Sequence, residues 1–191
     1  MLHAIARSTP PPRPAMDRLD AFESLVQSIA HQQVSIQAGA TIFRRVQLAA
    51  GGKATPEGLL AAGGDALRAA GFSRPKAAYA LDLAQKVATR DVDLPRLTQM
   101  PDEEVIAQLT SVKGIGVWTA KMFLLFHLER PDVLPHEDLG LQLAVASAYH
   151  VPRAKAAKKI RDLGPAWSPH ASYASLVLWN HRRVEASLPT R

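Results

Sequence analysis

The sequence of 191 residues contains no cysteine. Without a thiol the chain can form no disulfide, no cysteine-ligated zinc site, no iron–sulfur cluster and no thiol nucleophile. The sequence also has no apolar run near the ~20 residues that a membrane-spanning helix needs. Residues 1–7 lack the apolar core of a secretory signal. We therefore expect a cytoplasmic protein with no membrane partner.

Acidic residues are in the minority. The 17 Asp and Glu residues stand against 23 Lys and Arg, which gives a formal net charge of +6 with neutral histidine. A basic balance suits a polyanion such as nucleic acid, although many basic proteins bind none. The apolar fraction of 47% and the charged fraction of 21% are ordinary for a globular protein. A chain of this length can bury a core as one domain or as two small lobes.

Strand-like alternation of apolar and polar residues persists nowhere, whereas helical spacing recurs along the chain. Apolar residues at i, i+3, i+4 and i+7 mark one helix face in residues 22–29 and another in residues 141–148. Thr55 before Pro56 is typical of a capped helix start. The proline-rich residues 8–14 predict a stiff extended segment. The sequence therefore predicts an all-α protein with about ten helices.

The segment Leu109–Ala120 predicts two helices joined by a tight turn, with the whole motif covering about residues 105–126. The turn contains Gly114 and Gly116, and glycine lets the backbone take positive φ and come close to a ligand. The first N–H groups of the second helix point outward, which suits a phosphate. A hairpin of this kind can hold a nucleic-acid backbone without reading bases.

An acidic side chain follows this hairpin at the start of the next predicted helix. Residues 135–141 read Pro-His-Glu-Asp-Leu-Gly-Leu, which places Asp138 at a helix N-cap. A simple cap is the commoner role for such an aspartate. The N–H groups and the dipole of the helix would keep the carboxylate ionised. A hairpin that can bind a phosphate, followed by a positioned carboxylate, suggests chemistry on DNA.

These residues resemble the helix-hairpin-helix DNA glycosylase superfamily, and within it the 3-methyladenine DNA glycosylase II (AlkA-like) branch. Three blocks carry the resemblance: residues 22–35, residues 112–120 with 135–141, and residues 167–179. The resemblance implies two helical lobes with the active-site cleft between them. One lobe would join residues 1–30 to residues 137–191. The other, residues 31–136, would be a central bundle that carries the hairpin.

The resemblance assigns the catalytic role to Asp138. Breaking an N-glycosidic bond builds positive charge on the anomeric carbon of the sugar. A fixed carboxylate stabilises that charge and can orient or deprotonate water. Glu137 is the alternative acid, because some relatives place the carboxylate one residue closer to the proline.

The residue at position 118 separates two kinds of enzyme. In bifunctional members of the superfamily a lysine at the position of Trp118 forms a Schiff base, which leads to strand cleavage. Its absence predicts a monofunctional enzyme with no abasic-site lyase activity. An indole face would also favour a cationic alkylated purine by ~0.5–2 kcal/mol. The resemblance adds Trp179, Tyr173 and Met122 to the base pocket, although core packing would also explain Trp118, Trp179 and Tyr173.

The remaining expected contacts lie on two turns. Gln32 and Gln33 lie between two predicted helices, where a side chain could fill the gap that an extruded base leaves in DNA, although a solvated helix end would also explain them. On the hairpin the resemblance implies further DNA contacts and a structural Na⁺ or K⁺ ion. The DNA contacts are Lys113, Gly114, Gly116 and Thr119, and the backbone carbonyls around the ion are those of Thr110, Val112 and Ile115.

The resemblance thus implies a DNA glycosylase of base excision repair with no required cofactor. It would flip alkylated purines, of the 3-methyladenine and 7-methylguanine type, out of double-stranded DNA and release them by hydrolysis. We expect it to act as a monomer at the nucleoid. Two alternatives stay open: a helix-hairpin-helix module that binds damaged DNA without catalysis, and a glycosylase for another class of lesion. The missing hairpin lysine counts against the usual bifunctional enzyme for oxidised bases.

Overall fold

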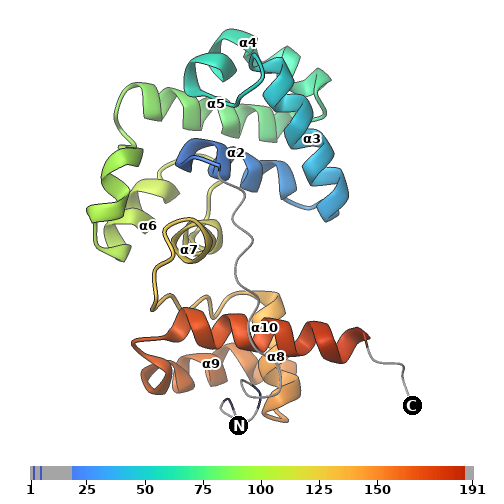
Figure 1. Cartoon of the computed structure of the whole chain (residues 1–191), viewed down its shortest axis with the longest axis vertical. Helices are drawn as coiled ribbons and strands as arrows, with labels where there is room; N and C mark the ends of the chain where they lie inside the picture. Colours follow the sequence, from blue (N-terminus) through green and yellow to red (C-terminus); the bar gives the residue numbers. More distant parts are fainter. Residues whose placement is uncertain (1, 3–4, 6–18, 188–191) are drawn as a thin grey trace. The chain divides into compact units, whose positions relative to one another are not determined.

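The computed structural model describes Leu2, Ile5 and residues 19–187, and the regular elements with described bounds are all helices. They are nine α-helices and one 3-10 helix, and the described residues contain no strand (Figure 1). The prediction of an all-α protein is therefore confirmed. The proline-rich residues 8–14 lie outside the described part. Within the described part, no helix combines the length and the apolar character needed to cross a membrane.

The helices divide between two compact units, a central unit of residues 17–123 and a terminal unit of residues 1–16 and 124–191. The central unit contains α2 (Ala21–His31), α3 (Ile36–Ala49), α4 (Pro56–Ala69), α5 (Arg74–Ala88), the 3-10 helix η1 (Leu94–Gln99) and α6 (Asp102–Thr110). The terminal unit contains α8 (Leu139–Ala148), α9 (Arg153–Trp167) and α10 (Ala171–Ser187). The division falls within α7 (Val117–Phe126).

These boundaries differ from the expected lobes of 31–136 and of 1–30 with 137–191. The reason at the first boundary is the packing of α2, which lies against α3 and α5 and so belongs with them. The reason at the second is a set of hydrogen bonds that joins the segment before α8 to the start of α10, described below. Neither set of contacts could be read from helical spacing alone.

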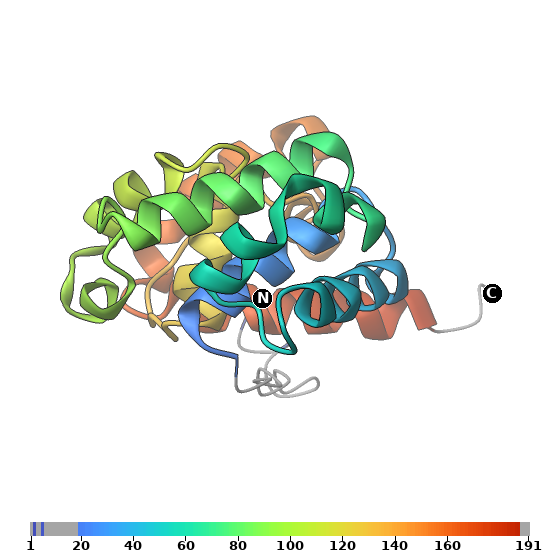
Figure 2. The same cartoon turned by 90° about the horizontal axis from the view of Figure 1, so that it is seen from above.

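The central unit is built on buried apolar faces. Leu25, Val26 and Ile29 of α2 have no exposed surface, and they match the predicted face. α4 and α5 pack side by side (Figure 1 and Figure 2). Several helices begin at a residue whose side-chain oxygen accepts the N–H three residues later, which satisfies a free donor at the helix start. These residues are Asp20, Ser35, Thr55 and Ser73, so the predicted cap at Thr55 is confirmed.

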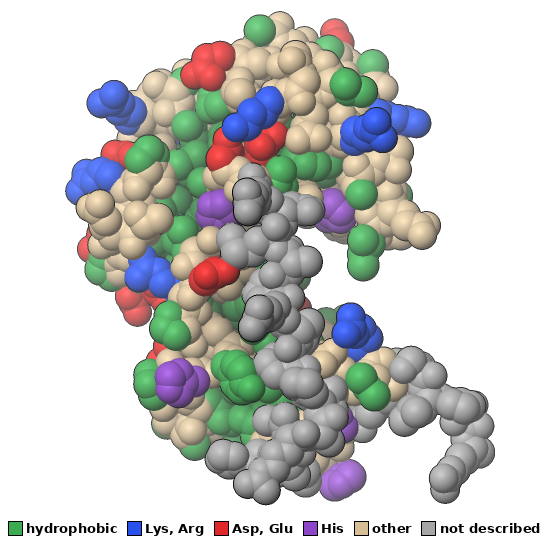
Figure 3. Space-filling model, in the orientation of Figure 1, with side chains coloured by type: hydrophobic (Ala, Val, Ile, Leu, Met, Phe, Trp, Pro, Cys, Tyr) green, Lys and Arg blue, Asp and Glu red, His purple; other side chains and the backbone are tan. Residues whose placement is uncertain are grey.

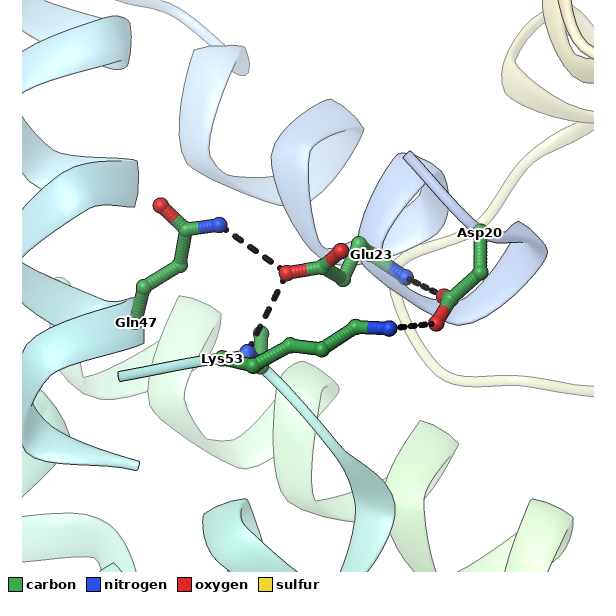
Figure 4. Close-up of polar contacts among 5 residues, drawn as sticks. Asp20, Glu23, Gln47 and Lys53 are labelled. Atoms are coloured by element: carbon green, nitrogen blue, oxygen red, sulfur yellow. Dashed lines mark hydrogen bonds and ion pairs between the residues drawn. The ribbon is translucent and has the colours of Figure 1, made fainter. Parts of the chain in front are cut away.

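A buried carboxylate ties α2 to the loop between α3 and α4. Glu23 is only 4% exposed, and its Oε1 accepts hydrogen bonds from Gln47 Nε2 at 2.9 Å and from the Ala54 N–H at 3.3 Å (Figure 4). One turn earlier, Asp20 Oδ2 lies 2.9 Å from Lys53 Nζ. The start of α2 is therefore fixed by buried Glu23, whose Oε1 has hydrogen-bond partners as a buried polar group requires, and by the exposed pair of Asp20 and Lys53.

The Asp20 pair predicts a pH-dependent stability. Burial raises the pKa of Asp20, but the hydrogen bond from the Glu23 N–H and the ion pair with Lys53 together lower it by more, so the pKa lies below its ordinary value. A lowered folded-state pKa stabilises the fold above the unfolded value near 3.9, and this contribution is lost as the pH falls through the folded pKa. The ion pair is solvent-exposed, so we expect it to contribute about 0.2–1 kcal/mol.

The variant Asp20→Asn keeps a capping oxygen but loses the charge. Its free energy of unfolding in urea should lie below that of the wild type at pH 7 and approach it as the pH is lowered toward 3. Asp20→Ala, which also loses the cap, should cost about 1 kcal/mol more at both pH values. A constant difference between Asp20→Asn and the wild type at pH 7 and pH 3 would contradict this account.

The terminal unit has its own apolar core, in which α8 packs against α9 and α10. Leu141 and Val145 of α8, Ile160 of α9 and Val177 and Leu178 of α10 have no exposed surface.

Hydrogen bonds fix the segment before α8 to the start of α10. Asp132 Oδ1 accepts from the Ala171 N–H at 3.1 Å, and Oδ2 accepts from Ser168 Oγ at 2.6 Å. Ser172 Oγ donates to the Arg130 carbonyl at 2.6 Å and accepts from the Val133 N–H at 2.9 Å. The chain that leads into α8 is thus held against the helix that carries Trp179.

Candidate active site

The hairpin has the predicted form, with α6 ending at Thr110 and α7 beginning at Val117. Between them the Val112 N–H donates to the Leu109 carbonyl at 3.1 Å, and the Ile115 N–H donates to the Val112 carbonyl at 3.1 Å. Val112 and Ile115 are 1% and 3% exposed, so they anchor the turn in the core of the central unit. The turn is therefore rigid where it leads into α7.

The two hairpin glycines have different roles. Gly114 has a φ of +78°, and a Cβ added there would overlap the ring of Tyr79. Gly116 has no positive φ, and a Cβ added there would meet nothing within 4 Å. Gly114 is therefore required by the turn itself, whereas Gly116 leaves an open surface at the start of α7, where a ligand can approach the backbone.

Lys113, the charged residue of the hairpin turn, is partly paired with Asp82. The Lys113 N–H donates to Asp82 Oδ2 at 2.8 Å, and its Nζ lies 3.8 Å from Asp82 Oδ1 with the side chain 76% exposed. Thr119, the other expected contact, is buried at 5% exposure. On the face of the central unit drawn in Figure 3, Lys and Arg side chains are spread over several places. The hairpin backbone, rather than a basic patch on that face, is the candidate for holding one phosphate.

The two glutamines after α2 differ in their contacts. Gln32 Nε2 donates to the Gly114 carbonyl at 2.9 Å, so this side chain reaches the hairpin turn. Gln33 is exposed and has a φ of +56°. The structure therefore brings Gln32 and Gly114 together, and it leaves the Gln33 side chain at the surface.

Asp138 caps α8, as the sequence predicts. Its Oδ1 accepts from the Leu141 N–H at 2.6 Å and from Trp179 Nε1 at 2.8 Å. The side chain is half-buried at the positive end of the α8 dipole. Two N–H donors from different helices thus fix the position of one oxygen of the carboxylate. The cap does not exclude a chemical role, because the same contacts that cap the helix also set the position of the charge.

Trp179, whose indole donates to Asp138, is itself held in place by Phe126. Trp179 stacks on Phe126, with ring centroids 5.9 Å apart and planes inclined by 20°. A Cβ added at Gly140 would lie 3.1 Å from Asp138 Oδ1 and 3.2 Å from Trp179 Nε1, tighter than most real contacts. The glycine in Asp-Leu-Gly therefore makes room for the hydrogen bond between the carboxylate and the indole.

Glu137, the alternative acid, makes different contacts from Asp138. Glu137 Oε2 lies 3.2 Å from His136 Nδ1, on the turn before α8. Glu137 precedes the cap position that Asp138 occupies. Asp138 is consequently the carboxylate that the helix start and Trp179 position.

The other expected pocket residues lie on α7 and α10. Trp118 is 46% exposed and Met122 half-buried, and their spacing of four residues places them on one face of α7. Tyr173 is 51% exposed, so like Trp118 it is not a core residue. Trp179 follows Tyr173 by six positions, which puts the two side chains on different faces of α10. In the terminal unit, therefore, Trp179 is joined to Asp138 by a hydrogen bond, and Tyr173 stays a prediction for the pocket.

Comparison with known proteins identifies the family. The pattern described as "HhH-GPD superfamily base excision DNA repair protein" matches residues 26–169. The chain belongs to the HhH-GPD superfamily.

Three relatives show how far the similarity extends. The putative DNA-3-methyladenine glycosylase YfjP of Bacillus subtilis is 31% identical over 165 residues, which cover 83% of this chain and 58% of that protein. The crystal structure of a DNA-3-methyladenine glycosidase from Bacillus halodurans matches with a TM-score of 0.82 and 34% identity, covering 97% of this chain and 85% of the other. The Schizosaccharomyces pombe 3-methyladenine DNA glycosylase Mag1, in complex with abasic DNA, matches with a TM-score of 0.81 and 26% identity, covering 93% and 88%. The chain thus spans little more than half of the B. subtilis relative.

The sequence also predicts a monovalent cation on the hairpin. A monovalent cation would be held by the backbone carbonyls of Thr110, Val112 and Ile115. Neutral carbonyl oxygens are the right donors for Na⁺ or K⁺, and the Val112 carbonyl also accepts the Ile115 N–H inside the turn. Among the described residues, no cluster of three His, Cys, Asp or Glu side chains could hold a metal ion. A monovalent cation held by these carbonyls stays a prediction.

One aromatic residue that contacts Trp179 in this candidate site was not predicted from the sequence. Phe126 follows Met122 by four residues on the same face of α7 and supports Trp179. It is 40% exposed, which is unusual enough for a large aromatic side chain to mark it. The spacing of Trp118, Met122 and Phe126 was the sequence signal that could have found it.

Proposed function

We propose that the chain is a monofunctional DNA glycosylase that removes alkylated purines, of the 3-methyladenine and 7-methylguanine type, from duplex DNA. The observation that carries this proposal is the Asp138 carboxylate, fixed by the Leu141 N–H and Trp179 Nε1. Two further facts support it: the HhH-GPD superfamily is one of base excision DNA repair proteins, and relatives are named DNA-3-methyladenine glycosylases.

The reaction follows from the charge of Asp138. The damaged nucleotide is extruded from the duplex, because its glycosidic bond cannot be reached inside the stack. As the bond between the base and C1′ breaks, the bonding electrons leave with the cationic base, which becomes neutral, and positive charge develops on the sugar. The Asp138 carboxylate stabilises this charge and orients or deprotonates the water that attacks C1′. An alkylated purine is already a good leaving group, so no strong general acid is needed.

The hairpin position of Trp118 supports the monofunctional reaction. An indole cannot form the Schiff base that precedes strand cleavage in lyases. The exposed ring of Trp118 is instead suited to stack on an extruded base, where a cationic purine gains from the electron-rich face. The product is therefore an abasic site in an intact strand.

The test is base release from methylated duplex DNA in the presence of EDTA. We expect free 3-methyladenine and 7-methylguanine by chromatography, and strands that stay intact until alkali is added. We also expect no covalent complex to be trapped by borohydride. Tight binding without released base would indicate a binding module. Strand breaks without alkali would overturn the monofunctional assignment, and release of oxidised bases alone would indicate another lesion class.

A further inference from the structure

Three hydrogen bonds hold the end of α2 just before Gln33. Lys76 Nζ donates to the Ala30 carbonyl at 2.9 Å, and burial lowers the pKa of this lysine. His31 Nδ1 lies 2.9 Å from the Gln27 carbonyl. Gln32 Nε2 donates to the Gly114 carbonyl. The last turn of α2 is therefore fastened to α5 and to the hairpin.

The contact from Gln32 joins two turns that lie 82 residues apart in the sequence. Its acceptor is fixed, because the positive φ of Gly114 and the ring of Tyr79 beside it set the orientation of that peptide. The hydrogen bond lies at the surface, although Gln32 as a whole is half-buried. The geometry is that of a strut between the loop after α2 and the hairpin.

The residue next to this strut is held in an unusual conformation. Gln33 has a φ of +56°, which residues other than glycine rarely adopt. Such a conformation persists when its surroundings impose it. The backbone just before Gln33 is held by the hydrogen bonds of Gln32 and Lys76. The side chain of Gln33 itself is exposed. The Gln33 side chain thus leaves the backbone directly after the residue whose amide is bound to Gly114.

We propose that Gln32 is a positioning residue that couples the hairpin to Gln33, and not a DNA contact as the sequence suggested. When the hairpin holds a phosphate, the strut sets the distance at which Gln33 meets the gap left by an extruded base. This inference rests on the proposed function for the identity of the ligand. The contact itself does not depend on the reaction at Asp138.

The test is a double-mutant cycle measured by binding, without catalysis. Gln32→Met keeps the length of the side chain but removes the donor, and Gln33→Ala removes the side chain that would enter the gap. The dissociation constant is measured by fluorescence anisotropy, at fixed salt, for a duplex with a tetrahydrofuran abasic site and for the same duplex undamaged. Gln47→Met is the matched control, because the Gln47 amide makes a hydrogen bond of the same length to buried Glu23.

We expect Gln32→Met to reduce the preference for the abasic duplex by about threefold to tenfold, the range of one net hydrogen bond. Binding to the undamaged duplex, and its dependence on salt, should stay unchanged, because the phosphate-binding backbone is intact. In the Gln33→Ala background, Gln32→Met should have little further effect, because it acts through Gln33. Gln47→Met should lower stability without changing the preference.

Other results would contradict the positioning role of Gln32. Additive losses in the double mutant would mean that Gln32 contacts DNA itself, and equal losses on both duplexes with a smaller salt slope would mean a phosphate contact. If Gln32→Met does not fold, Gln32→Asn, whose amide is too short to reach Gly114, is measured with the same expectations. If the cycle is non-additive but the protein releases no alkylated base, the positioning role of Gln32 is supported and the proposed function is rejected. If the losses are additive and the protein does release base, the proposed function is supported and the positioning role of Gln32 is rejected.

Discussion

Replacing Asp138 with Asn is expected to slow the release of alkylated purines by about 10²- to 10³-fold while the protein stays folded. Asn is as good an N-cap as Asp, and its oxygen can still accept from the Leu141 N–H and from Trp179 Nε1. Only the negative charge is lost, so the positive charge that develops on the sugar has no partner. The rate is measured under single-turnover conditions on methylated duplex DNA, and folding is checked by the midpoint of urea unfolding.

The matched control is Glu137→Gln on the neighbouring residue. Its side chain lies beside His136, outside the cap position, so we expect base release within about threefold of the wild type. If Glu137→Gln lost activity and Asp138→Asn kept it, the alternative acid would be the catalytic one. Equal losses in both variants would indicate a local disturbance of the turn rather than a role for one carboxylate.

The second large effect is expected on stability. Gly114→Ala should lower the free energy of unfolding by about 2–4 kcal/mol, because alanine at positive φ is strained and its Cβ would displace the Tyr79 ring. Shifting this peptide also moves the carbonyl that accepts from Gln32. Urea unfolding at pH 7 measures the loss.

Gly116→Ala provides the contrast within the same turn. A methyl group there meets open space, so stability should stay within about 0.5 kcal/mol of the wild type. The methyl group would instead obstruct the approach of a phosphate to the start of α7, and we expect weaker binding to duplex DNA. A large loss of stability in Gly116→Ala, or an unchanged free energy of unfolding in Gly114→Ala, would contradict the separate roles of the two glycines.

Features that depend on neighbouring residues were predictable from the sequence. The two glycines between two helical stretches indicated the hairpin, since turn chemistry and apolar spacing are local properties. Asp138 was predicted at a helix start for the same reason, because a cap needs only its own first turn. The family resemblance then gave these local features a function.

Features that depend on packing could not be derived in this way. The hydrogen bond from Trp179 to Asp138 spans 41 residues and exists because α8 packs against α10. The stacking of Phe126 on Trp179 depends on the same packing. Nothing in the local sequence indicated that the Gln32 amide donates to a carbonyl 82 residues away. Residue type and spacing indicate what a side chain can do, and only the fold shows which partner it has.

The proposed reaction depends most on one electrostatic interaction, the stabilisation of positive charge on the sugar by the Asp138 carboxylate. It is tested by the affinity for two duplexes, one with a cationic pyrrolidine in place of the damaged nucleotide's sugar and one with neutral tetrahydrofuran. We predict that the wild type prefers the cation by about tenfold or more and that Asp138→Asn loses this preference without losing affinity for the neutral analogue. An equal preference for the cation in both proteins would show that the charge of Asp138 does not act on the sugar.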